Sequence, residues 1–388
     1  MNQQIAPSAR SAPSLSNGGI VIGSTTLTAI RICASVVKTS FWCVELSNLP
    51  WRNILTVKKK RLLIIDGLNL FLRNFAAVPA LATNGNPIGG YWGFFKSMQK
   101  YMREINPDKI IVVWDGEGGS QRRKKMDSGY KAFRTPVRLN RNVKVLTDEE
   151  NKANKYWQMG RLLDQLNKLP IVQVTSSGVE ADDIIAIISR HGMFAEWQKV
   201  ILSSDKDFLQ LCDDGTVVYR PIQDKYWTWK TVIEEFGVHP VNFALARAAT
   251  SSDKSDNIAG IPGIGMKTMA SRFPFLAEGT EKTVDDVVQC CEEQIDGGSK
   301  VKAYMMVKDG RFIIEDNYRL MQLYMPHVSP HTMDIVRASL YEAEPTFNDT
   351  DFQRTLTSDG IVSYNWDVLT RWCNRILFDF KQEQKNNN

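Results

Sequence analysis

Nine acidic residues stand where predicted strands end or predicted helices begin, and carboxylates in such places can bind metal ions. Three of them follow buried apolar runs: Arg61-Leu-Leu-Ile-Ile-Asp66, Lys109-Ile-Ile-Val-Val-Trp-Asp115 and Lys199-Val-Ile-Leu-Ser-Ser-Asp205. The carboxyl ends of parallel strands meet at one crevice, and carboxylates gathered there repel one another unless cations neutralise them. Mg²⁺, which prefers oxygen ligands, is the expected cation. The predicted ligands are Asp66, Asp115, Glu180, Asp182, Asp183, Asp205, Asp207, Asp253 and Asp256.

The densest acidic motif is Glu180-Ala-Asp-Asp183, at the expected start of a helix. Glu180 and Asp183 are three residues apart and share a helix face, whereas Asp182 points to a different side. Acidic residues also decorate exposed helix starts, because they interact favourably with the helix dipole. The apolar residues that follow, Ile184 and Ile185 among them, indicate instead that this helix packs inward.

Two further acidic pairs occur in Ser204-Asp-Lys-Asp207 and in Asp253-Lys-Ser-Asp256. Each pair is weak evidence by itself, since isolated acidic pairs are common on protein surfaces. Together with the other carboxylates they supply enough oxygen atoms for two divalent ions. Such ions lie ~4 Å apart in phosphoryl-transfer sites, where they contact the attacking and leaving oxygens.

A glycine-rich segment follows the last acidic pair and reads Ile258-Ala-Gly260-Ile-Pro-Gly263-Ile-Gly265-Met-Lys267-Thr268. The glycines allow a tight turn and a close backbone approach, and the amides of the next helix can meet a phosphate. This pattern is typical of a helix-hairpin-helix that grips the DNA backbone without reading bases. The plain alternative is an ordinary helix–helix connection. No buried strand precedes the segment, which argues against a dinucleotide-binding loop.

Composition and charge fit a protein of 388 residues with 43% apolar and 23% charged residues and a net charge of +5. The basic residues concentrate between Arg122 and Lys144, where only Asp127 opposes them. A basic stretch beside an acidic crevice suits a polyanionic substrate, although a solvated basic loop would have the same composition. The six cysteines show no CxxC spacing or disulfide framework, and the four histidines show no zinc-ligand spacing.

The chain divides into an N-terminal extension (1–57), an α/β domain (58–236) and a helical C-terminal domain (237–388). The extension shows no sustained helical or strand period, its apolar run is too short to span a bilayer, and Val57 is a candidate alternative start. Alternating strands and helices from Arg61 predict a mostly parallel sheet covered on both faces. The expected strands cover 61–66, 109–115, 170–175 and 199–205, a hairpin covers 216–229, and the expected helices cover 68–77, 90–104, 148–168 and 180–191.

The ordered set of motifs resembles the flap endonuclease and 5′→3′ exonuclease family, which includes the 5′-nuclease domain of bacterial DNA polymerase I and phage ribonuclease H-type 5′ nucleases. The resemblance covers roughly 60–280. It implies a PIN-like, mostly parallel twisted sheet with a helical arch, then a helical domain containing a helix-hairpin-helix (helix-three-turn-helix). Many relatives have glycine where this chain has Ser252, so the local backbone before Asp253 is expected to differ.

The resemblance also implies residue roles. Asp66, Asp115, Glu180 and Asp182 would form the tighter metal site, and the remaining five carboxylates the second. Lys131 and Arg134, within Tyr130-Lys-Ala-Phe-Arg134, would contact the scissile phosphate and stabilise its developing charge. The implied DNA contacts are Arg122, Arg123, Tyr130, Gly260, Gly263, Gly265, Lys267 and Thr268.

From the resemblance we expect a monomeric nuclease with two Mg²⁺ ions (Mn²⁺ as a substitute) and a K⁺ ion at the glycine-rich turn. Its substrates would be DNA with 5′ flaps, nicks or RNA primers, in replication and repair. Single-stranded-DNA-binding protein or other replication proteins are the expected partners, and the expected location is the bacterial or phage-infected cytoplasm, at the nucleoid and not in a membrane. The alternative is a PIN-type endoribonuclease, which usually lacks the acidic pair at 253/256 and the glycine-rich grip. A DNA-binding protein without catalysis would be expected to have lost some of the nine carboxylates.

Overall fold

The computed structural model describes residues 59–132, 137–140, 145–250, 256–324, 326, 328–362 and 364–387. They belong to one compact unit, Val57–Asn388. The predicted extension, 1–57, lies outside the described residues. No helix in the described part of the chain is both long and apolar enough to cross a membrane.

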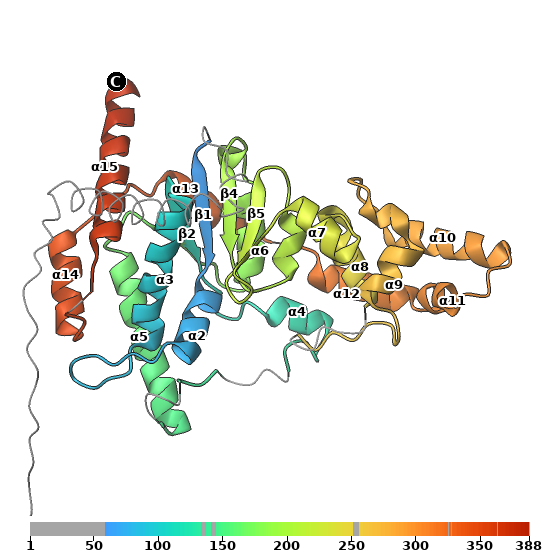
Figure 1. Ribbon diagram of the computed structural model, residues 1–388, viewed down its shortest axis with the longest axis horizontal. Coiled ribbons are helices and arrows are strands. Elements are labelled where there is room, and N and C mark those ends of the chain that lie inside the picture. Colours follow the sequence, from blue (N-terminus) through green and yellow to red (C-terminus); the bar gives the residue numbers. More distant parts are fainter. Residues whose placement is uncertain are drawn as a thin grey trace, which may run out of the picture. The chain divides into compact units, whose positions relative to one another are not determined.

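A six-stranded sheet forms the centre of the α/β part, in the order β3-β2-β1-β4-β5-β6 (Figure 1). All neighbouring strands are parallel except β5 and β6, which form the predicted antiparallel hairpin at one edge. This confirms the predicted mostly parallel α/β fold. The strands are β1 (Arg61–Asp66), β2 (Lys109–Val113), β3 (Val172–Val174), β4 (Gln198–Leu202), β5 (Thr216–Arg220) and β6 (Lys225–Trp227).

The two faces of β1 enter different parts of the core, because successive side chains of a strand point to opposite faces. Leu62 and Ile64 join a buried cluster with α6 (Ala181–Ser189). Helices α2 (Gly67–Ala77), α3 (Gly89–Ile105) and α5 (Asp148–Leu166) lie together on one side of the sheet (Figure 1). Both faces of the sheet are therefore covered, as the continuous apolar strands predicted.

The segment between α4 (Gln121–Met126) and α5 carries the predicted helical arch. Of its residues the structure describes 127–132, 137–140 and 145–147, and none of these is helical. Arg134 lies outside the described residues. The arch therefore stays a prediction.

A second core holds together α8 (Pro240–Ala249), α9 (Met266–Arg272), α10 (Val284–Asp296), α11 (Lys302–Asp309) and α12 (Arg311–Met321). Its buried residues include Leu245, Ile264, Val287 and Ile314. Helix α7 (Trp229–Phe236) instead places Val232 in the core cluster of the sheet. Helices α9, α10 and α11 lie beyond α8 in Figure 1. Short 3-10 helices, η2 (Gly192–Phe194), η3 (Asp207–Leu211) and η4 (Pro274–Ala277), connect several of the larger elements.

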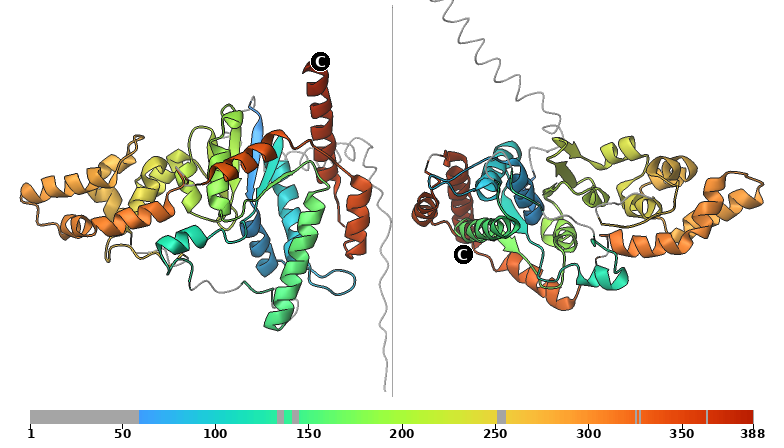
Figure 2. Two further views of the ribbon diagram at one scale, coloured as in Figure 1. Left: turned by 180° about the vertical axis from the view of Figure 1, so that it is seen from behind. Right: turned by 90° about the horizontal axis from the view of Figure 1, so that it is seen from below.

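The last three helices return to the α/β part, although they lie within the predicted C-terminal domain, 237–388. Val336 and Leu340 of α13 (Pro330–Tyr341) enter the same core cluster as the strands, and α13 crosses the sheet in the left view of Figure 2. Phe352 of α14 (Asp349–Ser358) meets Phe95 of α3 edge to face, with ring centroids 5.7 Å apart. Helix α15 (Asp367–Asn387) also contacts α3. The α/β core is thus completed by the C-terminal end of the chain.

Replacement of Phe352 by alanine should therefore destabilise the α/β core. Its side chain is 1% exposed and packs on both Phe95 and Trp366. We expect the free energy of unfolding to fall by about 3–5 kcal/mol, measured by denaturant titration. Phe378→Ala on the following helix is the matched control: this ring is 61% exposed, so a change within about 0.5 kcal/mol is expected. Equal effects of both substitutions would contradict this role for Phe352.

Candidate active site

The carboxyl edge of the sheet brings together acidic residues from four segments of the chain. Asp66 is the last residue of β1, the central strand, and pairs in register with Val113 of β2. Asp115 and Asp205 follow the neighbouring strands β2 and β4. Asp182 lies in the first turn of α6. The parallel pairing places these strand ends at one edge, as expected.

Asp66 is buried and held in one orientation by two donors. The Asn69 amide donates to Oδ1 at 3.1 Å, and the Ser203 hydroxyl donates to Oδ2 at 2.9 Å. Ser203 Oγ in turn accepts from the Asp205 amide at 3.1 Å, which links β1 to the loop after β4. Burial raises the pKa of Asp66 to about 7, and the charges of Asp115 and Asp205 add to this effect.

Asp182 experiences the same electrostatic repulsion. Burial raises its pKa well above the usual range, and the charges of Asp205 and Asp66 raise it further, whereas Lys131 and Arg123 lower it. We call Asp66, Asp115, Asp182 and Asp205 the acidic cluster. Burial and the neighbouring carboxylates raise the pKa of Asp66 and that of Asp182, so the site has an electrostatic demand for cations.

Two other predicted ligands are already neutralised by cations of the chain. Arg123 of α4 forms ion pairs with Glu180 and with Asp183, the latter at 2.9 Å, and its Nε donates to the Leu320 carbonyl at 3.0 Å. Lys131 Nζ lies 2.6 Å from Glu180 Oε1. The side chains of Arg123, Glu180 and Asp183 are all almost fully buried. Glu180 and Asp183 thus differ from the acidic cluster, whose four members form no ion pair with the described residues.

The positions of Arg123 and Tyr130 differ from the predicted ones. Both were expected to contact DNA, but each is 3% exposed. The Tyr130 hydroxyl donates to Glu180 at 3.2 Å. Their side chains are directed at the acidic residues rather than at solvent, because the buried carboxylates require donors. We therefore replace the predicted DNA contact by a role in holding Glu180. Arg122, on the same helix, is only partly buried.

Two of the remaining predicted ligands, Asp207 and Asp256, interact with residues that are far away in the chain. Arg247 of α8 forms an ion pair with Asp207, whose amide donates to Asp205 Oδ1 at 2.9 Å. Asp256 is buried, and its carbonyl accepts from the Lys131 amide at 2.9 Å. Asp253 lies outside the described residues.

The acidic cluster suits hard divalent cations in its chemistry, since all its side-chain donors are carboxylate oxygens. Its mutual repulsion supports the same conclusion. Among the described residues, however, no group of three or more Asp, Glu, His or Cys side chains is arranged so that it could hold a metal ion.

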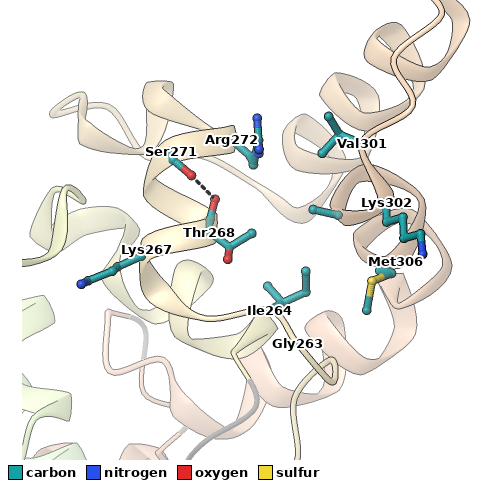
Figure 3. Close-up of a pocket in the computed structure, with 10 residues that line it drawn as sticks. Gly263, Ile264, Lys267, Thr268, Ser271, Arg272, Val301, Lys302 and Met306 are labelled. Carbon is teal, nitrogen blue, oxygen red and sulfur yellow. Dashed lines mark hydrogen bonds between the residues drawn. The ribbon is translucent and has the colours of Figure 1, made fainter.

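The predicted glycine-rich turn connects α8 to α9. Gly263 has φ +80°, a conformation that glycine adopts without strain, and it is exposed. Beside it lies a cavity of 420 Å³ between α9 and α11 (Figure 3). Lys267 and Thr268 line it as part of α9, whereas Gly260 and Gly265 are partly buried residues of the turn itself.

Several residues of these sites escaped the sequence analysis. Arg272 of α9 and Lys302 of α11 also line the cavity, and neither forms an ion pair in the described part of the chain. Lys302 comes from a helix with no motif, so no sequence signal placed it there. Arg247 was also missed, because nothing local indicated that α8 would face Asp207.

Comparison with known proteins agrees with this architecture. The sequence profile of the 5′-3′ exonuclease N-terminal, resolvase-like domain matches residues 61–237. A 5′-3′ exonuclease of Aquifex aeolicus is 31% identical over 212 residues, which make up 54% of this chain and 67% of that protein. The chain belongs to the 5′-3′ exonuclease family.

Other members of this 5′-3′ exonuclease family are parts of larger enzymes. The thermostable DNA polymerase I of Thermus aquaticus is 33% identical over 214 residues, and the chain spans only 23% of its length. The DNA polymerase I of Rhizobium leguminosarum is 32% identical over 224 residues, 20% of its length.

Solved structures share the fold. The bacteriophage T5 D15 protein, co-crystallised with metal ions, matches 82% of this chain and 98% of its own, at 20% identity and a TM-score of 0.52. The T5 D15 flap endonuclease in a pseudo-enzyme-product complex with DNA and metal ions is 18% identical, with a TM-score of 0.53. This match also covers 82% of the present chain and 98% of the other. The likeness extends past the matched nuclease domain to the C-terminal helices.

The raised pKa of Asp66 predicts a pH dependence of stability in the presence of a chelator. Between its ordinary value of 3.8 and about 7, the folded protein retains a proton that the unfolded chain has lost. The free energy of unfolding should therefore fall as the pH rises through this window. Asp66→Asn should show a shallower fall, measured by denaturant titration at a series of pH values. An unchanged slope in the variant would contradict the raised pKa.

Proposed function

We propose that the protein is a divalent-metal-dependent 5′ nuclease that hydrolyses phosphodiester bonds near the 5′ ends of branched or nicked DNA. The observation that carries this proposal is the acidic cluster, a group of carboxylates at the carboxyl edge of the sheet in which the pKa of Asp66 and that of Asp182 are raised. Membership of the 5′-3′ exonuclease family supports it. The relatives that form complexes with metal ions and DNA support the same substrate class.

The acidic cluster would hold the metal ions, Mg²⁺ or Mn²⁺ in its place. Bound there, such ions neutralise phosphate charge and activate water for attack. Asp207, Asp253 and Asp256 would complete the second site, and Glu180 and Asp183 would take part once the ion pairs around them rearrange. The Asn69 amide and the Ser203 hydroxyl would keep Asp66 oriented throughout.

Lys131 would stabilise the developing negative charge on the scissile phosphate, with Arg134 in the same role. Lys131 lies beside the site, with its Nζ directed at Glu180, and only 15% of its side chain is exposed. Its φ of +57° places it on an unusual backbone, and its amide donates to Asp256. The hydrogen bond to Asp256 would hold Lys131 near the carboxylates.

The cavity beside Gly263 would bind the phosphate backbone of the duplex. Lys267, Arg272 and Lys302 carry positive charges around it, and the hydroxyls of Thr268 and Ser271 line the same space (Figure 3). Phosphate contacts of this kind position a duplex without reading its sequence. A K⁺ ion at the turn, removal of RNA primers, action in replication and repair, the monomeric state, recruitment by single-stranded-DNA-binding protein and a cytoplasmic location remain predictions.

Asp182→Asn tests the proposed activity. With Mg²⁺ and 5′-labelled flap, nicked, RNA-primed and single-stranded substrates, we expect cleavage by the wild type and a loss of at least about a hundredfold in the variant. Mg²⁺ should also raise the melting temperature of the wild type more than that of the variant. Asp164→Asn, an exposed carboxylate on α5, is the control and should change neither quantity. Full activity of Asp182→Asn would exclude the proposed site.

Substitution of Arg272 and Lys302 by glutamine tests the duplex grip. The double variant should bind duplex DNA more weakly whatever its sequence, and its slope of log affinity against log salt should fall by about one for each phosphate that it no longer binds. Slow cleavage of short single strands should survive, because the acidic cluster is unchanged. Arg319→Gln, an arginine of α12 that is 63% exposed and does not line the cavity, is the control. If the double variant lost much more affinity for one duplex sequence than for another, this result would contradict a contact with the DNA backbone.

A further inference from the structure

A larger cavity lies at the edge of the sheet opposite to the acidic cluster. Its volume is 680 Å³, which is in the range of sites that bind ligands. Lys60, Lys109 and Val172 line it where β1, β2 and β3 begin. Since these strands are parallel, their amino ends lie a strand's length away from the carboxyl ends that carry the proposed nuclease site.

Aromatic and aliphatic side chains form much of the wall. Trp197 and Phe194 lie in edge-to-face contact with ring centroids 5.3 Å apart, and Tyr341 adds a ring that is 60% exposed. On α15, Ile376 and Phe380 line the cavity. They continue the helix face whose earlier residues, Trp372 and Cys373, are buried in the core. This apolar face therefore extends past the packed core and into the cavity.

The charges around the cavity leave a negative excess. Lys60 Nζ lies 2.7 Å from Glu383, and Lys109 Nζ donates to the Leu340 carbonyl at 3.1 Å, so both cations have partners. Glu344 and Asp379 line the same space and are exposed, and neither has an ion pair or hydrogen bond among the described residues. An occupant with positive charges next to apolar groups would match both features of the wall.

We propose that this cavity is a docking site for a peptide segment of a partner protein in which lysine or arginine side chains alternate with large apolar ones. The apolar side chains would insert between Trp197, Tyr341 and Phe380, and the cationic groups would meet Glu344 and Asp379. A nucleic acid is a poor occupant, because its phosphates would face these two carboxylates. A partner bound here would leave the acidic cluster and the duplex-binding cavity open, so it could tether the nuclease without blocking its substrate.

The test uses the full chain and a short fluorescein-labelled peptide of alternating leucine and lysine, with binding followed by fluorescence anisotropy. The double variant Glu344→Lys and Asp379→Lys should bind this peptide about tenfold more weakly, because two exposed ion pairs each contribute up to about 1 kcal/mol. Glu342→Lys makes one such charge reversal beside the cavity, at a residue that does not line it, so the affinity of this variant should equal that of the wild type. A peptide of alternating leucine and glutamate should not bind at this site.

Flap cleavage should be the same in all three proteins, so failure of the docking proposal would be distinguishable from failure of the nuclease assignment. Equal affinity of the wild type and the double variant would place the peptide elsewhere, for example on the acidic cluster, and would overturn the proposal. So would equal binding of the glutamate peptide. If light scattering showed a dimer that the double variant abolishes, the occupant would be a second copy of this chain and not a partner peptide.

Discussion

Repulsion among carboxylates at one edge of a parallel sheet is the constraint on which the rest of this structure depends. Asp66 is the end of the central strand, and its raised pKa reflects burial together with the charges of Asp115 and Asp205. A buried carboxylate next to other carboxylates is costly for a fold, because unpaired buried charge is unfavourable. The protein carries this cost at the place where a divalent cation would remove it. The same arrangement that lowers the stability of the ion-free protein would make the site bind cations.

Part of the repulsion is relieved by cations that come from other regions of the chain. Arg123 ties α4 to α6 through Glu180 and Asp183, and to α12 through the Leu320 carbonyl. Arg247 ties α8 to the loop after β4 through Asp207. These contacts join the site to α8 and α12, which pack against the helices α9 and α11 of the proposed duplex grip. The contacts of Arg123 and Arg247 with the acidic residues therefore also help to hold α4, α6, α8 and α12 in place around the site.

The C-terminal helices give the sheet a second functional edge. Because α13 and α14 return to the α/β core, α15 lies beside the amino ends of the strands and forms one wall of the large cavity. The carboxyl edge presents carboxylates that suit divalent cations, and these cations would in turn meet the phosphates of a polyanion. The amino edge presents aromatic rings and two exposed carboxylates suited to a basic, apolar peptide. One parallel sheet thus separates the two surfaces by the length of its strands.

Local patterns in the sequence were sufficient to predict the strands, helices α2, α3, α5 and α6 of the α/β part, and the meeting of Asp66, Asp115 and Asp205. Continuous apolar runs of this length form buried parallel strands, and parallel strands bring their carboxyl ends together whatever the loops do. The tight turn was predictable for a similar reason, since glycine adopts without strain the positive φ of +80° found at Gly263. Both inferences depend only on neighbours in the chain.

The tertiary structure decided which carboxylates have partners. Arg123 looked like a DNA contact, because a basic run is normally solvated, but its burial against Glu180 depends on packing of α4 against segments 57 residues and more away. Lys302 reached the duplex cavity, and Phe352 reached Phe95, through helix packing that no short motif encodes. Side-chain partners across such distances follow from how the helices dock, which depends on the whole set of apolar faces at once. The sequence alone therefore determined where acidic groups would gather, whereas only the fold determined which of them are neutralised.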